Sequence, residues 1–165
     1  MNIPYQMRTE NSCGPDAMAC ATNIDHAAID RAWGIDDIND FKDVADTPWN
    51  HFSALKKLNI PWTIRTCGDI QAGRCANQKT VILVHSTDHP LLAQHWVVLN
   101  AVYPDGTVSV HWGDGSLKVF GPESFRRIYS DGKNIGPQFA YEVGIGSTKL
   151  SWYQRAYAWV TGKFI

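Results

Sequence analysis

The order of the predicted secondary structure indicates an α+β fold, with a helical half packed against an antiparallel β-sheet half. The first 60 residues hold segments with apolar residues at helical spacing, whereas later segments are β-branched runs separated by turns. The chain has 165 residues, of which 44% are hydrophobic and 19% charged, as expected for one globular domain. Because helices precede strands instead of alternating with them, two packed halves are expected.

The helical half is predicted from three segments with helical patterning. Pro15 suits the first turn of the first helix, and Gly34 ends the second. The third has apolar side chains at helical spacing on one face. The expected helices span 14–22, 24–33 and 48–59.

The sheet half is predicted from short apolar runs. The runs TVILVHS and HWVVLNAVY are rich in β-branched residues, as expected for central strands. Pro61 confines the first strand to an edge or to a strand start, and the PDG tripeptide predicts a turn. A short helix is expected over 121–129. The expected strands span 60–66, 80–86, 95–103, 107–112, 116–120 and 139–145.

Composition argues against several classes of function. The net charge is −1, so no nucleic-acid partner is expected. No run of 18 apolar residues is present, so no transmembrane segment is expected. The first residues, MNIPYQMRTE, lack a signal-peptide pattern, which favours a cytoplasmic location, with export by another route or incorporation in a larger particle as alternatives. The cysteines lack CxxC spacing, so no zinc ribbon and no metal is expected.

Cys13 is the candidate nucleophile. It lies in RTENSCGPDAMAC, at the predicted start of a helix, where unpaired N–H groups stabilise a thiolate. Gly14 would let a substrate carbonyl approach, the Cys13 amide could donate to an oxyanion, and Ser12 could cap the helix. Asp16 favours the helix start but would repel the thiolate if the side chains met. Taken alone, the motif is a weak signal and favours a structural thiol over a nucleophile.

His95 is the candidate base. It opens the apolar strand QHWVVLN, and a strand end on a rigid sheet can hold an imidazole against a helix of the other half. Along the strand, His95 alternates with Val97 and Leu99. His26 and His51 fall in predicted helices among polar neighbours and are expected at the surface. A strand histidine can also be a structural core or rim residue.

These two motifs together resemble the papain-like cysteine peptidases, closest to the branch that processes bacteriocin leader peptides at double-glycine sites. The shared features are CGPDAMA at a helix start and HWVVLNAVYPDGTVSV in the sheet, and the likeness covers roughly residues 3–129. The resemblance implies a papain-like fold, a thiol protease of bacterial or phage type, and Cys13 and His95 as the catalytic pair.

The resemblance also implies two supporting residues. The family has a glutamine about six residues before the cysteine, whose amide helps to form the oxyanion hole. Gln6 lies seven residues before Cys13, and Asn11 is the substitute if Gln6 turns away.

A third catalytic group should accept a hydrogen bond from the far nitrogen of the histidine. The family spacing falls on His111, but Asp114 is the nearest carboxylate and would orient an imidazole better. Asp114 is therefore the expected third residue, with His111 or no third group as alternatives.

The predicted function is a cysteine hydrolase that cleaves an amide bond in a peptide through a thioester, without a cofactor. One alternative is a catalytically degenerate papain-fold module that binds or supports a larger assembly. A second alternative is an endopeptidase that cuts the peptide stems of the bacterial cell wall, with a peptidoglycan stem as substrate.

The C-terminal segment is expected to form a separate element. Residues 1–146 are predicted to form the peptidase domain, and residues 147–165 an amphipathic helix with an aromatic face. That face either closes the core of the domain or docks on a protein partner or a membrane surface through residues 149–165.

Overall fold

The computed structural model describes residues 2–37, 40–41, 48–85, 94–130 and 139–146. Within these residues the chain forms five α-helices and one six-stranded antiparallel sheet, which confirms the α+β class. The helices are α1 (Cys13–Thr22), α2 (His26–Trp33), α3 (Pro48–Lys57), α4 (Cys67–Gln71) and α5 (Pro122–Ser130). The strands are β1 (Trp62–Arg65), β2 (Thr80–Val84), β3 (His95–Val102), β4 (Val108–His111), β5 (Leu117–Phe120) and β6 (Phe139–Val143).

The sheet has the strand order β1-β6-β2-β3-β4-β5, and every neighbouring pair is antiparallel. β2 and β3 occupy the centre, as their apolar sequences predict, and β1 lies at an edge, as Pro61 predicts. His95, the first residue of β3, pairs with Val84, the last residue of β2. His95 therefore lies at the rim of the sheet.

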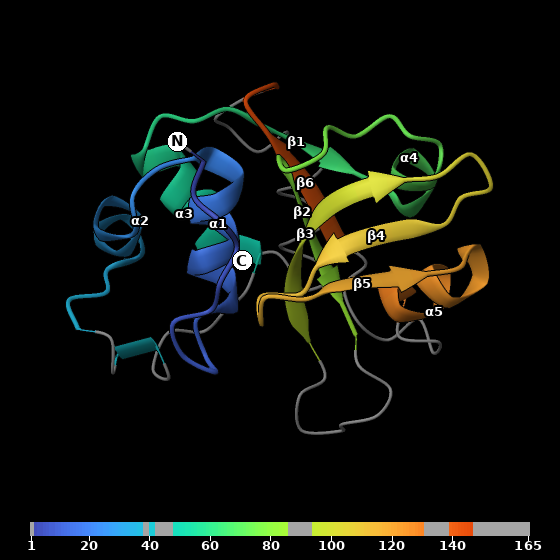
Figure 1. Cartoon of the computed structure of the whole chain (residues 1–165). Helices are drawn as coiled ribbons and strands as arrows, with labels where there is room; N and C mark the ends of the chain where they lie inside the picture. The colour runs from blue at the N-terminus through green and yellow to red at the C-terminus, as the bar shows by residue number, and fades with distance from the viewer. Residues whose placement is uncertain (1, 38–39, 42–47, 86–93, 131–138, 147–165) are drawn as a thin grey trace.

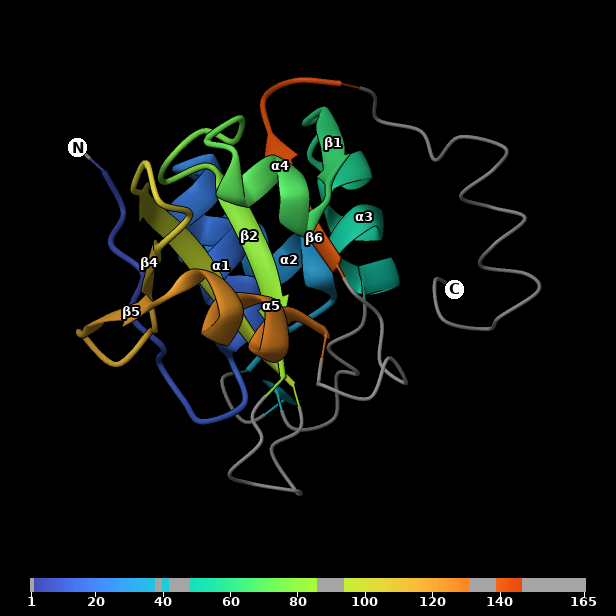
Figure 2. The same cartoon turned by 90° about the vertical axis from the view of Figure 1, so that its right-hand side faces the viewer.

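Helices cover both faces of the sheet (Figures 1 and 2). α1, α2 and α3 pack on one face, where Trp96 and Val98 of β3 join their core. α4 and α5 pack on the other face, where Val97 and Leu99 join a second core. The alternation of β3 thus divides its apolar side chains between two cores, which explains its near-continuous apolar sequence.

Two features differ from the sequence-based expectation. α4 is not among the helices expected from the sequence; it is a single short helix that Thr66 and Asp69 start with a reciprocal capping box. His51 was expected at the surface and is instead fully buried. Its Nδ1 lies 2.5 Å from the Tyr141 hydroxyl, and its ring packs 3.9 Å from that of Trp96. A buried partner for the ring nitrogen removes the cost of burying it.

No helix within the described ranges is long and apolar enough to cross a bilayer. The predicted C-terminal helix, residues 147–165, lies outside the described residues, as does its predicted docking surface at residues 149–165.

Candidate active site

Cys13 is the first residue of α1, as the sequence predicts, and is half-buried. The first hydrogen bond of the helix runs from the Asp16 amide to the Ser12 carbonyl, at 3.0 Å. The amides of Cys13 and Gly14 therefore precede the helical ladder, and Pro15 has no amide hydrogen. The positive end of the helix dipole lies at the thiol, which is the environment that the motif predicts.

Ser12 occupies the N-cap position but does not cap α1 with its side chain, contrary to the expectation. Its hydroxyl oxygen instead accepts hydrogen bonds from the amides of Arg8 and Thr9, at 3.1 and 2.9 Å. The same hydroxyl donates to the Asp16 carboxylate at 2.6 Å. The serine side chain thus binds the entry loop (residues 8–12) rather than the helix amides.

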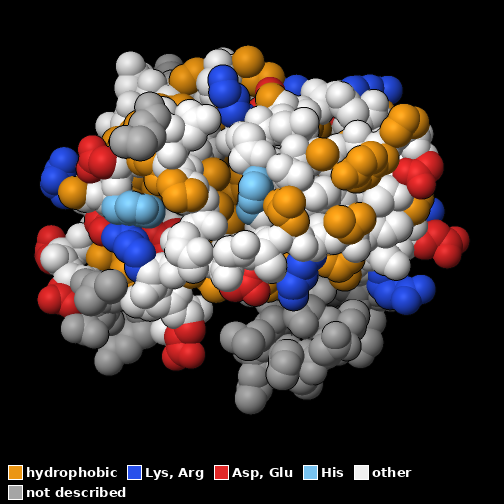
Figure 3. Space-filling model, viewed as in Figure 1, with side chains coloured by type: hydrophobic (Ala, Val, Ile, Leu, Met, Phe, Trp, Pro, Cys, Tyr) orange, Lys and Arg blue, Asp and Glu red, His pale blue; other side chains and the backbone are white. Residues whose placement is uncertain are grey.

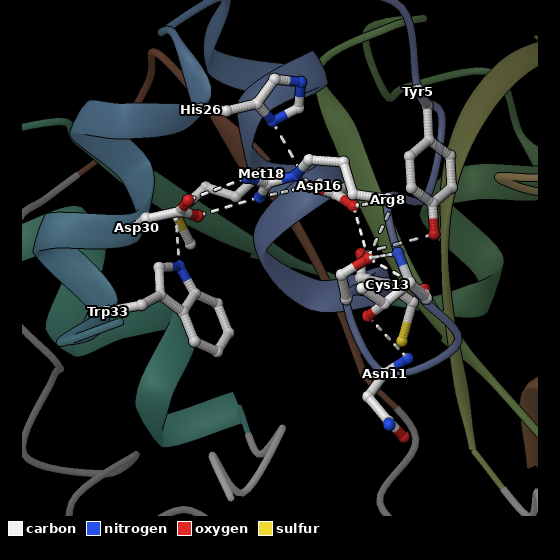
Figure 4. Close-up of polar contacts among 11 residues, drawn as sticks. Tyr5, Arg8, Asn11, Cys13, Asp16, Met18, His26, Asp30 and Trp33 are labelled. Carbon is white, nitrogen blue, oxygen red and sulfur yellow. Dashed lines mark hydrogen bonds and ion pairs between the residues drawn. The ribbon is translucent and has the colours of Figure 1, made fainter. Parts of the chain in front are cut away.

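The negative charge of Asp16 is compensated by an arginine side chain. The Asp16 side chain is fully buried, and Arg8 binds it through Nε at 2.7 Å and through a terminal nitrogen at 2.6 Å. Figure 4 shows Arg8 lying between Asp16 and Asp30, while the Cys13 sulfur points out of the first turn towards the Asn11 side of the loop. The repulsion that the sequence suggested is therefore offset by a guanidinium group.

His95 has a fixed tautomer. Its Nε2 lies 2.6 Å from the backbone carbonyl oxygen of Trp112. A carbonyl oxygen can only accept, so Nε2 carries the proton and the lone pair of the neutral ring is on Nδ1. The Trp112 ring lies beside the imidazole, with centroids 4.7 Å apart and the ring planes tilted by 44°. Nδ1 is therefore the atom of His95 that can take up a proton.

Tyr5 ties the two halves of the site together. Its hydroxyl lies 2.5 Å from the Trp96 carbonyl oxygen and 3.4 Å from the Cys13 carbonyl oxygen. Trp96 follows His95, and α1 packs directly on β3. Figure 1 shows the loop that enters α1 and the start of β3 at the same, lower end of the molecule. The structure thus brings the Cys13 and His95 backbones to one end of the interface between α1 and the sheet.

The Gly113 turn (residues 112–116) supplies the carbonyl that orients His95. Gly113 has a φ of +100°, and a Cβ at this position would lie 2.8 Å from the Tyr5 ring. The Met7 amide donates to the Gly113 carbonyl at 2.8 Å, and Gln6 forms an isolated β-bridge with Asp114. Only glycine fits against Tyr5 here, so the turn and the N-terminal segment fix each other.

Asp114, the expected third residue, does not occupy the orienting position at His95 Nε2. Its exposed carboxylate accepts hydrogen bonds from the amide and hydroxyl of Ser116, at 3.0 and 2.5 Å, and these lower the pKa of Asp114. The Trp112 carbonyl holds the Nε2 contact instead. The alternative, His111, pairs with Val98 across the sheet rather than with His95, and burial lowers its pKa.

Gln6 is exposed, and its side-chain oxygen lies over Gly115, 3.5 Å from where a Cβ would stand. Its neighbour Tyr5 is buried and reaches the Cys13 carbonyl. Since successive side chains of an extended segment point to opposite sides, Gln6 points away from the side that Tyr5 occupies. Asn11, the substitute donor, is also exposed, and its amide nitrogen in the backbone donates to Thr9 Oγ1.

Sequence reasoning missed three contributors to the site: Tyr5, Gly113 and the Trp112 carbonyl. Tyr5 has no motif signal, because its role depends on two backbone carbonyls far apart in the sequence. The GDG tripeptide signals a turn, but the sequence gives no sign that the carbonyl before it faces a histidine.

The other cysteines differ from Cys13 in environment. All four are thiols. Burial raises the pKa of Cys20 and of Cys75 to about 11, and burial also raises that of Cys67. These three are therefore poor nucleophiles at neutral pH. Within the described residues no three His, Cys, Asp or Glu side chains cluster as a metal site would require.

The face shown in Figure 3 has apolar side chains in its middle and acidic and basic groups interspersed towards its periphery.

No protein-family model matches the chain, and comparison with curated proteins finds no significantly similar sequence. The papain-like interpretation therefore depends on the residues described above.

Proposed function

We propose that this chain is a papain-like cysteine peptidase or amidase, with Cys13 as nucleophile and His95 as general base and acid. The observation that carries the proposal is the state of His95 at the sheet rim: its Nε2–H bonds the Trp112 carbonyl, which leaves the lone pair on Nδ1. Tyr5 joins the backbone beside this histidine to the backbone of Cys13 at the start of α1.

The proposed reaction is acyl transfer. His95 Nδ1 takes the thiol proton, and the Cys13 thiolate attacks the amide carbon, while the developing oxyanion accepts a hydrogen bond from the Cys13 amide. The C–N bond then breaks as His95 gives its proton to the leaving amine. Water, deprotonated by His95, hydrolyses the thioester, which releases the acid and restores the thiol.

The Trp112 carbonyl takes the orienting role in this scheme. A carbonyl carries only a partial negative charge, so it stabilises imidazolium less than a carboxylate does. It still fixes the tautomer and the ring direction, which is the larger requirement when the thiolate is already stabilised by a helix N-terminus.

A degenerate binding module is the second candidate, favoured by the exposed Gln6 and by the bonding of Asp114 to Ser116. A defined peptide mixture, analysed by mass spectrometry after incubation, separates the two functions. Purified cell-wall stem peptides form a second arm, which tests the endopeptidase alternative.

The peptidase predicts new peptide termini with the native protein, none with Cys13→Ala, and cleavage retained in Cys20→Ala as the matched control. The absence of cleavage in both arms, together with alkylation of Cys13 no faster than that of free cysteine, would contradict the proposal and favour the binding module.

A further inference from the structure

A buried polar cluster joins the entry loop to α1 and α2. At its centre is Asp16, whose side chain is fully buried. Its carboxylate accepts from the Arg8 amide at 2.8 Å and from Arg8 Nε at 2.7 Å. It also accepts from the Ser12 hydroxyl at 2.6 Å, and His26 Nδ1 lies 3.3 Å away. Figure 4 shows these side chains converging on Asp16.

A buried carboxylate is stable only when charged and hydrogen-bonding partners surround it. Among the described residues, the hydrogen bonds to the Asp16 carboxylate come from Arg8 and Ser12, the two ends of the entry loop, while His26 Nδ1 lies within ion-pair distance. The requirement to pair Asp16 therefore determines the path of the chain directly before Cys13.

The Ser12 side chain binds this cluster and does not cap α1. A serine at an N-cap normally accepts from an amide of the first helical turn. Here its hydroxyl oxygen accepts from the loop amides of Arg8 and Thr9, and α1 begins without a side-chain cap. The Ser12 side chain therefore holds the entry loop and does not cap the first turn of α1.

Arg8 pairs with a second carboxylate of this cluster, that of Asp30, as well as with Asp16. Arg8 forms a bidentate pair with Asp30, at 2.8 and 2.9 Å, in addition to its contacts with Asp16, and its guanidinium lies 4.9 Å from the Phe41 ring centroid. One guanidinium thus serves two carboxylates. Removal of the Asp16 charge leaves Arg8 paired with Asp30, so on charge alone it would make a thiolate at Cys13 more favourable.

We propose that Asp16 is a positioning residue for Cys13. By binding Arg8 and Ser12, it fixes the path of the entry loop and with it the position of the Cys13 backbone at the start of α1. This inference rests on the proposed function, because it assumes that Cys13 is the reacting thiol.

The test is the rate of Cys13 alkylation by iodoacetamide as a function of pH, read by peptide mass spectrometry, in the native protein and in Asp16→Asn. Loss of positioning predicts alkylation about tenfold slower at pH 6, equivalent to about one unit in the thiol pKa. An effect of charge alone predicts the opposite sign, namely faster alkylation.

Arg74→Gln is the matched control, because it removes an arginine that follows α4 and pairs with Asp69 at the surface, and it should leave the rate unchanged. Ser12→Ala removes a single hydroxyl from the cluster and should slow alkylation in the same direction; it decides the question if Asp16→Asn does not fold by circular dichroism.

The outcomes separate this inference from the proposed function. If native Cys13 reacts no faster than free cysteine, the proposed function fails. A second outcome is that native Cys13 is selectively alkylated, but Cys13 in folded Asp16→Asn reacts as fast as in the native protein or faster. In that case the positioning role is wrong, while the proposed function stands. Ser12→Ala is used instead if Asp16→Asn does not fold.

Discussion

The two sides of the candidate site are held in place by different chemistry. On the helix side, the entry loop is fixed by a buried carboxylate, Asp16, with charged and hydroxyl partners. On the sheet side, His95 is oriented by a backbone carbonyl on a turn that exists because Gly113 lacks a side chain. The only carboxylate of that turn, Asp114, faces solvent and binds Ser116.

This difference shows where each side is vulnerable. The helix side depends on side chains, so it should respond to changes of charge and hydroxyl groups. The sheet side depends on backbone geometry, so it should respond to changes in the space around the turn and tolerate loss of its carboxylate. Tyr5 contacts both sides, because its hydroxyl bonds the Cys13 carbonyl on the helix side and the Trp96 carbonyl on the sheet side.

The largest effect is expected from Gly113→Ala. The added Cβ would lie 2.8 Å from the Tyr5 ring and 3.0 Å from Met7 Cγ, at a φ of +100°. We expect a loss of about 3 kcal/mol in the free energy of unfolding, measured by urea denaturation, with a slower alkylation of Cys13.

The matched control is Gly34→Ala. Gly34 has a φ of +75° but nothing within 4 Å of an added Cβ, so only the conformational cost of about 1–2 kcal/mol applies. Equal losses in the two variants would show that the contact between Gly113 and Tyr5 does not hold the turn.

Tyr5→Phe tests the link between the two sides. It removes the donor that meets the Trp96 and Cys13 carbonyls but keeps the buried ring. We expect a loss of about 1–2 kcal/mol in unfolding free energy and alkylation of Cys13 slowed by about tenfold. Tyr103→Phe, at an exposed tyrosine, should change neither quantity. An unchanged alkylation rate in Tyr5→Phe would mean that the two sides are positioned independently.

The pH dependence of the unfolding free energy tests the burial of Cys20, which lies inside α1. Burial raises the pKa of Cys20 from 9.0 to about 11. Because the folded-state pKa is raised, the stabilisation is fully present below pH 9 and is lost as the pH rises towards 11. The urea midpoint should therefore fall over this interval, and it should fall less in Cys20→Ala. The same decline in both proteins would exclude Cys20 as a source.

The smallest effect is expected from Asp114→Asn. The carboxylate is exposed and binds only its neighbour Ser116 among the contacts described, so alkylation of Cys13 and peptide cleavage should change by less than about twofold. An aspartate that orients a catalytic histidine contributes about 10⁴-fold. A loss of that size would restore Asp114 as the third catalytic residue.

The sequence was sufficient to predict the α+β class, the helix start at Cys13 and the two central strands. Each of these follows from local periodicity or from residues within one turn of the feature, such as Pro15 beside Cys13. His95 at a strand end was predicted for the same reason.

The supporting residues could not be predicted in the same way. The partner of His95 is a main-chain atom, which no residue type reveals, and Tyr5 acts across 91 residues of sequence to Trp96. His51 was misjudged because its polar neighbours in sequence are not its neighbours in space, where Trp96 and Tyr141 enclose it. The identity of Cys13 as a nucleophile stays a prediction.

The most direct test of the central claim is the pH profile of Cys13 alkylation in the native protein and in His95→Ala. A Cys13–His95 pair predicts that native Cys13 is alkylated rapidly at pH 6, with a midpoint below about 7.5, and that His95→Ala moves the midpoint towards the ordinary value of about 8.5. Cys20 and Cys75, whose pKa values are raised to about 11, serve as internal references that stay unlabelled. A native midpoint near about 8.5 that is unchanged in His95→Ala would contradict the catalytic pair.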